Sequence, residues 1–94
     1  MRMIKSVRGS ATRQFIESGK SKFSGMDEAL ADMRLAQLRR VKSLAELGFF
    51  RGTRLHKLTG DLKDHWSISI NGPWRIIFRF EDGDAYDVQI IDYH

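Results

Sequence analysis

Apolar and polar residues alternate along the C-terminal part of the chain with a period of two, which is typical of half-buried strands. The alternation predicts three strands, over residues 66–70, 74–80 and 86–91. Turn sequences, Asn71-Gly72 and Asp82-Gly83, separate them. The apolar positions of these strands predict one side of a core, and Trp66 and Trp74 are expected in it.

Directly paired residues share a face of a sheet, so the lengths of the turns must keep the apolar positions together. A two-residue first turn would place Ser69 opposite Trp74, whereas a three-residue turn pairs Ile70 with Trp74. The same parity predicts a second turn with an odd number of residues, for example residues 82–84. The last two strands then pair Phe78 with Val88, Ile76 with Ile90 and Arg75 with Ile91. A β-bulge would undo this register.

The N-terminal half has a different pattern. Residues 3–7 are expected to form a short first strand, and residues 10–18 a short helix with Gly19 as its left-handed C-terminal residue. A basic loop, residues 19–25, follows.

A second helix is expected after this loop, with Ser24 as its N-cap, Asp27 in a capping-box-like position and Gly48 at its end. Its apolar stripe at 100° per residue comprises Met26, Ala29, Leu30, Met33, Ala36, Val41, Leu44 and Leu47. Leu35 and Leu38 fall outside the stripe. They could be core residues, form a seam for another helix or contact a partner.

Two helices followed by an antiparallel sheet predict an α+β fold in one domain, residues 1–94, with the two N-terminal helices packed on one face of a small antiparallel-rich β-sheet. The chain has 94 residues and 41% of them are hydrophobic, enough for one modest core. A domain of this size is marginally stable, so a protein partner could add stability.

Composition narrows the classes of function. The chain has no cysteine, and no spacing of residues resembles a metal site, so no metal and no cofactor are expected. No apolar run approaches the roughly 18 residues of a membrane span, and residues 1–9 do not resemble a signal peptide. We therefore expect a cytoplasmic protein without a membrane partner.

Charge is distributed unevenly along the chain. Residues 1–57 hold thirteen Lys and Arg against five Asp and Glu, a net charge of +8, whereas residues 58–94 hold three against seven, a net charge of −4. A basic half suits a polyanion or an acidic protein as partner. Basic helices on an ordinary solvated surface would give the same count, so charge alone leaves both interpretations open.

Candidate catalytic groups gather on the predicted open face of the sheet. The register places Tyr93 diagonally next to Arg75, with Arg79 two residues beyond Ile77 on the same strand and Asp92 and His94 flanking the tyrosine. His56 lies on a short segment, residues 54–58, before the strand predicted over residues 66–70.

These residue types suit RNA cleavage. A base must take the proton of the 2′-OH, an acid must protonate the leaving oxygen, and a cation must stabilise the charged phosphorane. Histidine can be base or acid near neutral pH, and arginine grips phosphate oxygens. Tyrosine can stack on a splayed base or exchange a proton.

Each candidate also has a purely structural interpretation. His56 could be an ordinary surface residue, and His65 is expected at a strand edge. Arg75 and Arg79 could make cross-strand pairs with Asp87. The last three residues could be a polar tail.

The order and spacing of five segments resemble the HigB-like toxins of the RelE/ParE superfamily. These segments are Leu55-His56-Lys57-Leu58-Thr59-Gly60-Asp61, Trp66-Ser67-Ile68, Asn71-Gly72-Pro73-Trp74-Arg75-Ile76, Gly83-Asp84-Ala85-Tyr86 and the terminal Asp92-Tyr93-His94. The resemblance covers mainly residues 55–94. The N-terminal half matches in its two-helix layout, its basic loop and the opening Met-Ile-Lys-Ser at residues 3–6.

The resemblance implies a ribosome-dependent mRNA endonuclease that is inhibited by an antitoxin, expected to be a helix-turn-helix DNA-binding protein. It implies catalytic roles for His56, Asp92, Tyr93 and His94, and less directly for Arg75. The expected RNA-binding residues are Arg2, Lys5, Arg8, Lys20, Lys22, Arg39, Arg40, Lys42, Lys57 and Arg79.

One departure concerns a lysine that some relatives carry in the run His-Pro-Leu-Lys-Gly-Asp. This chain has His-Lys-Leu-Thr-Gly-Asp, in which Lys57 is the nearest replacement. Two other functions remain compatible with the same fold, a toxin that poisons DNA gyrase and a non-catalytic RNA-binding module.

Overall fold

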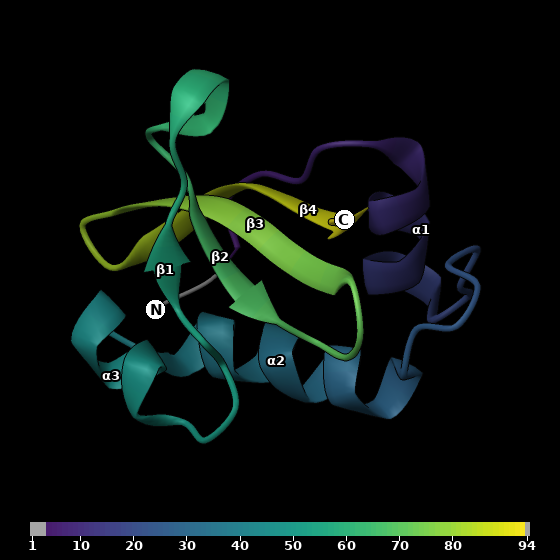
Figure 1. Ribbon diagram of the computed structural model, residues 1–94. Coiled ribbons are helices and arrows are strands. Elements are labelled where there is room, and N and C mark those ends of the chain that lie inside the picture. The colour runs from purple at the N-terminus through teal and green to yellow at the C-terminus, as the bar shows by residue number, and fades with distance from the viewer. Residues whose placement is uncertain (1–3, 94) are drawn as a thin grey trace.

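The computed structural model describes residues 4–93 of the chain. A four-stranded antiparallel sheet with the strand order β1-β2-β3-β4 lies over a layer of helices (Figure 1). Its strands are β1 (His56–Lys57), β2 (Trp66–Ser69), β3 (Trp74–Glu81) and β4 (Asp84–Asp92). The predicted α+β architecture, with N-terminal helices on one face of an antiparallel sheet, is confirmed.

Helix α1 (Ser10–Ser18) has the bounds that the sequence predicts. Gly19 ends it in the left-handed conformation, φ 76°, and donates its N–H to the carbonyl of Phe15. The hydroxyl of Thr12 accepts the backbone N–H of Ile90 at 3.0 Å. This buried contact fixes α1 against the C-terminal half of β4.

The predicted long second helix is wrong, because residues 41–43 divide it into α2 (Glu28–Arg40) and α3 (Leu44–Phe49). Asp27, not Ser24, caps α2 by accepting the N–H of Leu30 at 3.0 Å. Gly48 lies inside α3 instead of ending the helix.

A second capping motif explains the break. Ser43 accepts the N–H of Glu46, and the Glu46 carboxylate accepts the N–H of Lys42 at 2.6 Å. This Ser-x-x-Glu arrangement satisfies backbone donors of a new helix start. Val41, in extended conformation, buries its side chain between the two helices' ends.

The predicted apolar stripe of α2 is displaced for the same reason. Ala31, Leu35 and Leu38 are buried, while Met33 is 44% exposed, and Ala29 and Ala36 also face solvent. The predicted stripe assumes one continuous helix. Residues beyond the break do not share the rotation of α2, so the stripe assigns the wrong face of α2 to the core. Leu35 and Leu38 are therefore core residues, not a seam or a partner's contact.

A buried arginine on α2 ties the helix layer to the sheet. Arg34 is 3% exposed, and it donates to Gln37 on its own helix and to the carbonyls of Ser69 (2.9 Å) and Arg51 (3.1 Å). Burial lowers the pKa of this guanidinium. Gly52 leaves room for it, since a Cβ there would lie 2.9 Å from the Arg34 Nη2.

The first predicted strand, residues 3–7, is not a continuous strand, and Met3 lies outside the described residues. Ile4 and Val7 make isolated parallel bridges to Ala85 and Val88 of β4. Asp87, between these two β4 residues, has a positive φ of 53°. The resulting bulge interrupts the ladder, so the backbone of the N-terminal segment bonds to β4 on either side of Asp87, at Ala85 and Val88.

The predicted first turn is confirmed. Ile70 donates its N–H to the carbonyl of Trp74 at 2.9 Å, and the β2–β3 pairing continues in that register. The three-residue turn therefore keeps Ile68 and Ile76 together on the helix-covered face.

The second turn has two residues, Asp82 and Gly83, and not the predicted three. Both have positive φ values, 51° and 85°, as a type I′ hairpin turn requires. A register shift between Ile77 and Arg79 compensates for the missing turn residue. The predicted pairs of Ile76 with Ile90 and Arg75 with Ile91 are therefore confirmed although the predicted turn is wrong.

The core lies between the sheet and the helices. Its fully buried side chains include Phe15, Leu35, Leu38, Leu47, Ile68, Ile76, Phe78 and Val88. Trp66 and Trp74, expected inside, are only half-buried and pack against its edge. In residues 4–93 no helix is long and apolar enough to cross a membrane.

Candidate active site

The candidate site lies on the sheet face opposite the helices. Pairing across the strands places His56, Ser67, Ile77 and Gln89 in one row on this face. Arg75 lies two residues from Ile77 on the same strand and therefore shares the face. The turn from β2 and the C-terminal end of β4 form its rim (Figure 1).

Arg75 and Tyr93 meet at this rim, as predicted. The Arg75 Cζ lies 5.9 Å from the centroid of the Tyr93 ring. The backbone N–H of Tyr93 donates to the carbonyl of Pro73 at 2.7 Å, which holds the residue beside the β2–β3 turn. The tyrosine side chain is 47% exposed, so it can contact a ligand that reaches the arginine.

The guanidinium of Arg75 is incompletely satisfied. Its Nε and Nη1 are buried and have no hydrogen-bond partner in the described part of the chain. Buried polar groups normally have partners, and leaving a donor unpaired costs about 1–3 kcal/mol. Donation from this planar cation to phosphate oxygens requires the atoms that cover the two nitrogens to move aside.

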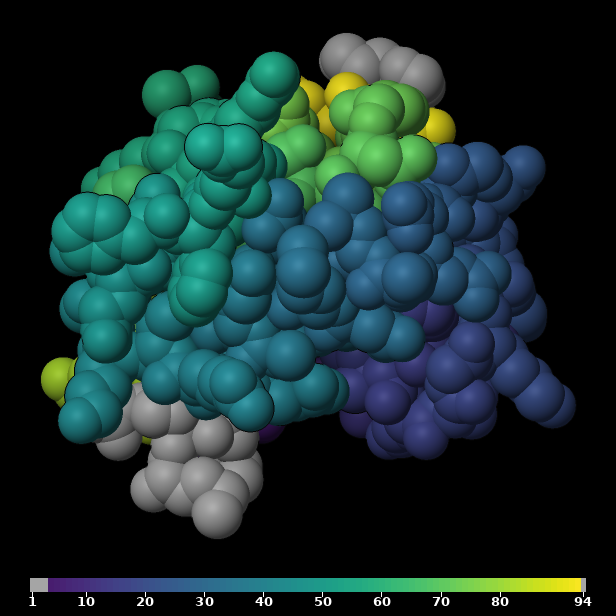
Figure 2. All heavy atoms as spheres, turned by 90° about the horizontal axis from the view of Figure 1, so that it is seen from below, coloured from purple at the N-terminus to yellow at the C-terminus, as the bar shows by residue number. Residues whose placement is uncertain are grey.

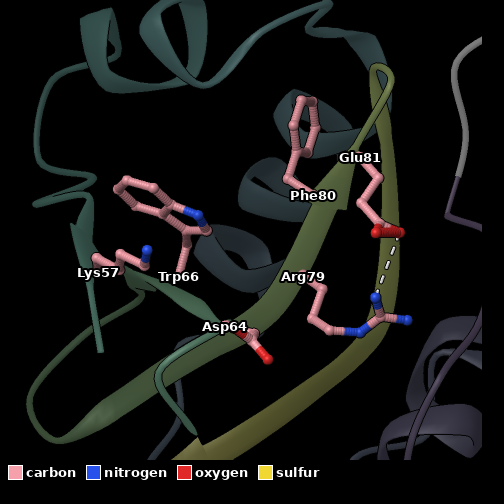
Figure 3. Close-up of a pocket in the computed structure, with 6 residues that line it drawn as sticks. All are labelled: Lys57, Asp64, Trp66, Arg79, Phe80 and Glu81. Carbon is pink, nitrogen blue, oxygen red and sulfur yellow. Dashed lines mark hydrogen bonds and ion pairs between the residues drawn. The ribbon is translucent and has the colours of Figure 1, made fainter. Parts of the chain in front are cut away.

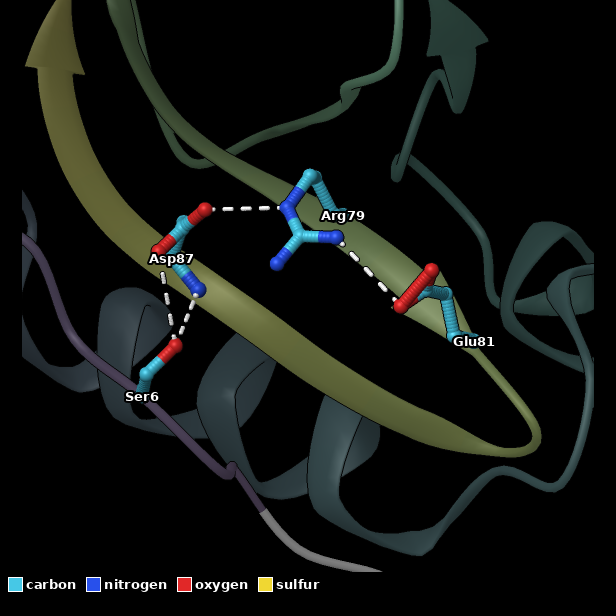
Figure 4. Close-up of polar contacts among 4 residues, drawn as sticks. All are labelled: Ser6, Arg79, Glu81 and Asp87. Atoms are coloured by element: carbon cyan, nitrogen blue, oxygen red, sulfur yellow. Dashed lines mark hydrogen bonds and ion pairs between the residues drawn. The ribbon is translucent and has the colours of Figure 1, made fainter.

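Arg79, in contrast, already has anionic partners (Figure 4). It donates to Asp87 at 2.9 Å and to Glu81 at 3.3 Å, so the predicted cross-strand pair is confirmed for this arginine. The bond from Arg79 holds the pKa of the Asp87 carboxyl below its usual range, and the same bond raises the pKa of Arg79. Ser6 accepts the N–H of Asp87 at 2.7 Å and so supports the bulge.

The other predicted catalytic residues are less closely placed. His56 is exposed on β1, with its Nδ1 3.1 Å from the carbonyl of Arg54. It shares the face of Arg75 but lies two strands across and two residues along from it, about 12 Å at the usual spacing and rise of strands. Asp92 pairs with Trp74 at the end of β4, which places it on the other face. His94 lies outside the described residues.

His65 and Ser67 are polar residues that sequence analysis did not propose for the site. His65 directly precedes β2, and it is only 7% exposed, while Ser67 is fully buried. Both His65 ring nitrogens and the Ser67 hydroxyl are without a partner within residues 4–93. The period-two pattern, extended back from Ser67 and Ser69, is the signal that could have placed His65 on the same face as Ser67.

The predicted RNA-binding residues divide into separate groups, and Arg2 lies outside the described residues. Lys20 and Lys22 are exposed on the loop after α1. Asn71 ties this loop to the β2–β3 turn by bonding the N–H of Asp27 and the carbonyl of Gly25. The loop is therefore near the Arg75 end of the site.

The remaining cations lie elsewhere on the fold. Arg39, Arg40 and Lys42 are exposed at the C-terminal end of α2, in the layer below the sheet (Figures 1 and 2). Lys5 and Arg8 are exposed on the segment beside β4. The described part of the chain also holds no group of three histidine or acidic side chains that could bind a metal ion.

Comparison with known proteins identifies the class to which this fold and site belong. The family model described as the RelE-like toxin of the type II toxin–antitoxin system HigB matches residues 5–94. The chain therefore belongs to the HigB-like toxin family, which confirms the resemblance, and a type II toxin has an antitoxin as its partner. It is also 34% identical to Endoribonuclease HigB of Proteus vulgaris, over 98% of this chain and 100% of that protein.

Proposed function

We propose that the protein is an endoribonuclease that cleaves mRNA on the ribosome, with its catalytic centre at the Arg75 end of the open sheet face. The observation that carries the proposal is the pair of unsatisfied buried donors on Arg75 beneath an exposed tyrosine. The curated relative of matching length is named an endoribonuclease, which supports the same activity.

The proposed reaction is attack by the 2′-OH of the RNA on the adjacent phosphorus. Arg75 donates to the phosphate oxygens and stabilises the charge that develops on them in the transition state. Tyr93 stacks on a splayed base or orients the 2′-OH. His56 and His94 share the transfer of protons to and from the ribose oxygens, and Asp92 orients one of these partners.

Dependence on the ribosome follows from the openness of the site. His56 and Tyr93 are exposed on a sheet face, so we expect the protein alone to hold an RNA strand weakly. A ribosome would supply the orientation that the open face lacks. The basic residues on the loop after α1, on the segment beside β4 and at the end of α2 would dock on ribosomal RNA phosphates.

The antitoxin is proposed to be a helix-turn-helix DNA-binding protein, as the family resemblance implies. Purification of the protein from its native operon should recover a small DNA-binding partner in the same complex. Recovery of the toxin alone, from cells that express the whole operon, would contradict this assignment.

A translating extract tests the proposed function. Purified protein is added to the extract, and primer extension on a defined mRNA maps the 5′ ends that appear. We expect cuts within translated codons and none when initiation is blocked. Intact mRNA together with inhibited gyrase supercoiling would overturn the proposal in favour of the gyrase-poisoning function.

A further inference from the structure

A hollow at the edge of the sheet lies apart from Arg75 and Tyr93. Its volume is about 390 Å³, within the roughly 300–1,000 Å³ range of small-ligand sites. It is lined by Lys57, Asp64, Trp66, Arg79, Phe80 and Glu81 (Figure 3). We call it the Trp66 hollow.

The hollow arises because β3 continues past the beginning of β2. Trp66 and Phe78 form the last pair between these strands, so residues 79–81 have no β2 neighbour. The turn that carries Asp64 and the short strand β1 enclose the space that remains. The hollow thus follows from the unequal lengths of β2 and β3 and from the turn that precedes β2.

Two aromatic rings form its apolar walls. Trp66 and Phe80 are both half-buried, and a gap separates their side chains (Figure 3). The indole nitrogen of Trp66 faces the hollow (Figure 3), whereas the indole of Trp74 donates to the carbonyl of Ser24. A flat ring could therefore stack on exposed aromatic surface and meet the indole N–H of Trp66.

Charged groups of both signs complete the lining. The Lys57 Nζ lies 6.0 Å from the centroid of the Trp66 ring and is not ion-paired in the described structure. Asp64 likewise has no ion pair or hydrogen bond there, whereas Glu81 is bonded to Arg79. A lining that holds an unpaired carboxylate as well as an unpaired ammonium disfavours a phosphate and favours a neutral ring with both donors and acceptors on its edge.

We propose that the Trp66 hollow binds a splayed guanine base of single-stranded RNA. Guanine offers a carbonyl oxygen to Lys57 and two adjacent N–H groups to the two oxygens of Asp64, while its ring stacks on Trp66. The edges of adenine, cytosine and uracil do not present this combination of one carbonyl beside two N–H groups.

The proposal rests on the proposed RNA cleavage, because the strand must pass from Arg75 on the open face around the edge of the sheet to Trp66, which shares the helix-covered face with Phe78. Arg79, at the border of the hollow, lies four residues along β3 from Arg75, a path of about 13 Å at the rise of a strand. A strand cut at Arg75 would place a base a few nucleotides away in the hollow. Guanine would then contribute to the choice of cleavage site or to docking on ribosomal RNA.

Binding is tested first on the free protein, without ribosomes. Tryptophan fluorescence is titrated with GMP, AMP, CMP and UMP. We expect saturable quenching by GMP at a concentration about tenfold lower than for the other nucleotides, because a bidentate contact to a base edge discriminates by about that factor or more. Trp66→Phe should remove the quenching, and Trp74→Phe should retain it.

Asp64→Asn is the specificity variant and Asp61→Asn its matched control, since Asp61 is an exposed carboxylate outside the hollow. Asp64→Asn should lower the affinity for GMP about tenfold or more, and Asp61→Asn should leave it unchanged. Equal quenching by all four nucleotides, or no effect of Asp64→Asn, would overturn the proposal. Both variants lie on the surface, so the test does not depend on the folding of the Trp66 variant.

Cleavage then separates the two possible sources of the base. If the guanine belongs to mRNA, Asp64→Asn should reduce cutting about tenfold only at sites with a nearby guanine. If it belongs to ribosomal RNA, cutting should fall equally at all sites. Wild-type cleavage of mRNA without selective GMP binding would refute only the guanine site in the Trp66 hollow. GMP binding without any mRNA cleavage would refute only the proposed function.

Discussion

Arg75 should be essential for cleavage and dispensable for folding. In Arg75→Ala two buried donors that have no partner in the described structure are removed together with the charge. Removal of one preorganised donor that stabilises transition-state charge typically lowers the rate about 10²–10³-fold. We therefore expect Arg75→Ala to lower mRNA cleavage at least about 10²-fold.

The expected effect on stability has the opposite sign to that of an ordinary buried arginine. Each unsatisfied buried donor costs about 1–3 kcal/mol in the folded protein, and its removal offsets the packing lost with the aliphatic part of the side chain. The melting temperature of Arg75→Ala should therefore equal or exceed that of the wild type. Arg75→Lys should restore only part of the activity, since an ammonium lacks the planar fork.

Arg79→Ala is the matched control, because Arg79 lies on the same strand and face but is already paired with Asp87 and Glu81. Its cleavage rate at sites without a nearby guanine should fall by less than about tenfold, since half-exposed ion pairs contribute little. The assay is single-turnover cleavage of ribosome-bound mRNA, with circular dichroism melts of each variant. Normal cleavage by Arg75→Ala, or a large loss of its stability, would refute the assignment of a phosphate-binding role.

Four further predictions concern the scaffold and the ends of the site. Arg34→Met should destabilise the protein by about 2–4 kcal/mol in chemical denaturation, because it leaves the Ser69 and Arg51 carbonyls without their donor. Gly52→Ala, at φ 83° and in contact with the same guanidinium, should cost about 1–3 kcal/mol. The depressed pKa of Asp87 implies stability that is present above about pH 4 and lost as the pH falls through the folded-state pKa, so Asp87→Asn should flatten the acid limb of a melting-temperature profile. Deletion of His94 should abolish growth inhibition with an unchanged melt.

Each of these predictions has an outcome that contradicts it. Wild-type stability of Gly52→Ala would show that neither the positive φ nor the close approach to Arg34 costs free energy. A wild-type denaturation midpoint for Arg34→Met would show that the three bonds of Arg34 contribute nothing net. An unchanged acid limb in Asp87→Asn would show that its bond to Arg79 does not persist in solution. Full toxicity of a folded chain that lacks His94 would remove the last residue from the catalytic centre.

Local patterns predicted much of this fold because they depend on neighbours in sequence. The parity of apolar positions was sufficient to identify the three-residue turn before Trp74, and Gly19 marked the end of α1. The Ser43-x-x-Glu46 capping motif is also local in sequence and marks the start of α3, which the continuous apolar stripe does not indicate.

Other features depend on contacts between distant segments and could not be read in this way. The positive φ of Asp87 is supported by a hydrogen bond to Ser6, 81 residues away. The bulge at this residue restores the predicted pairing of β3 with β4 although the turn between them has two residues. The burial of Arg34 depends on carbonyls of β2 and of the turn after α3. At the site, parity placed Tyr93 beside Arg75, but only the packing shows that Arg75 has unpaired donors and Arg79 does not.

The central claim is that the Arg75 end of the open face promotes attack by a 2′-OH on the neighbouring phosphate. It is tested most directly by cleavage of ribosome-bound mRNA that carries a single 2′-deoxynucleotide at the mapped cut site. We predict that the all-ribose mRNA yields a 2′,3′-cyclic phosphate and a 5′-hydroxyl end, and that the deoxy substitution abolishes cutting at that position. Undiminished cutting of the deoxy-substituted mRNA would contradict the account.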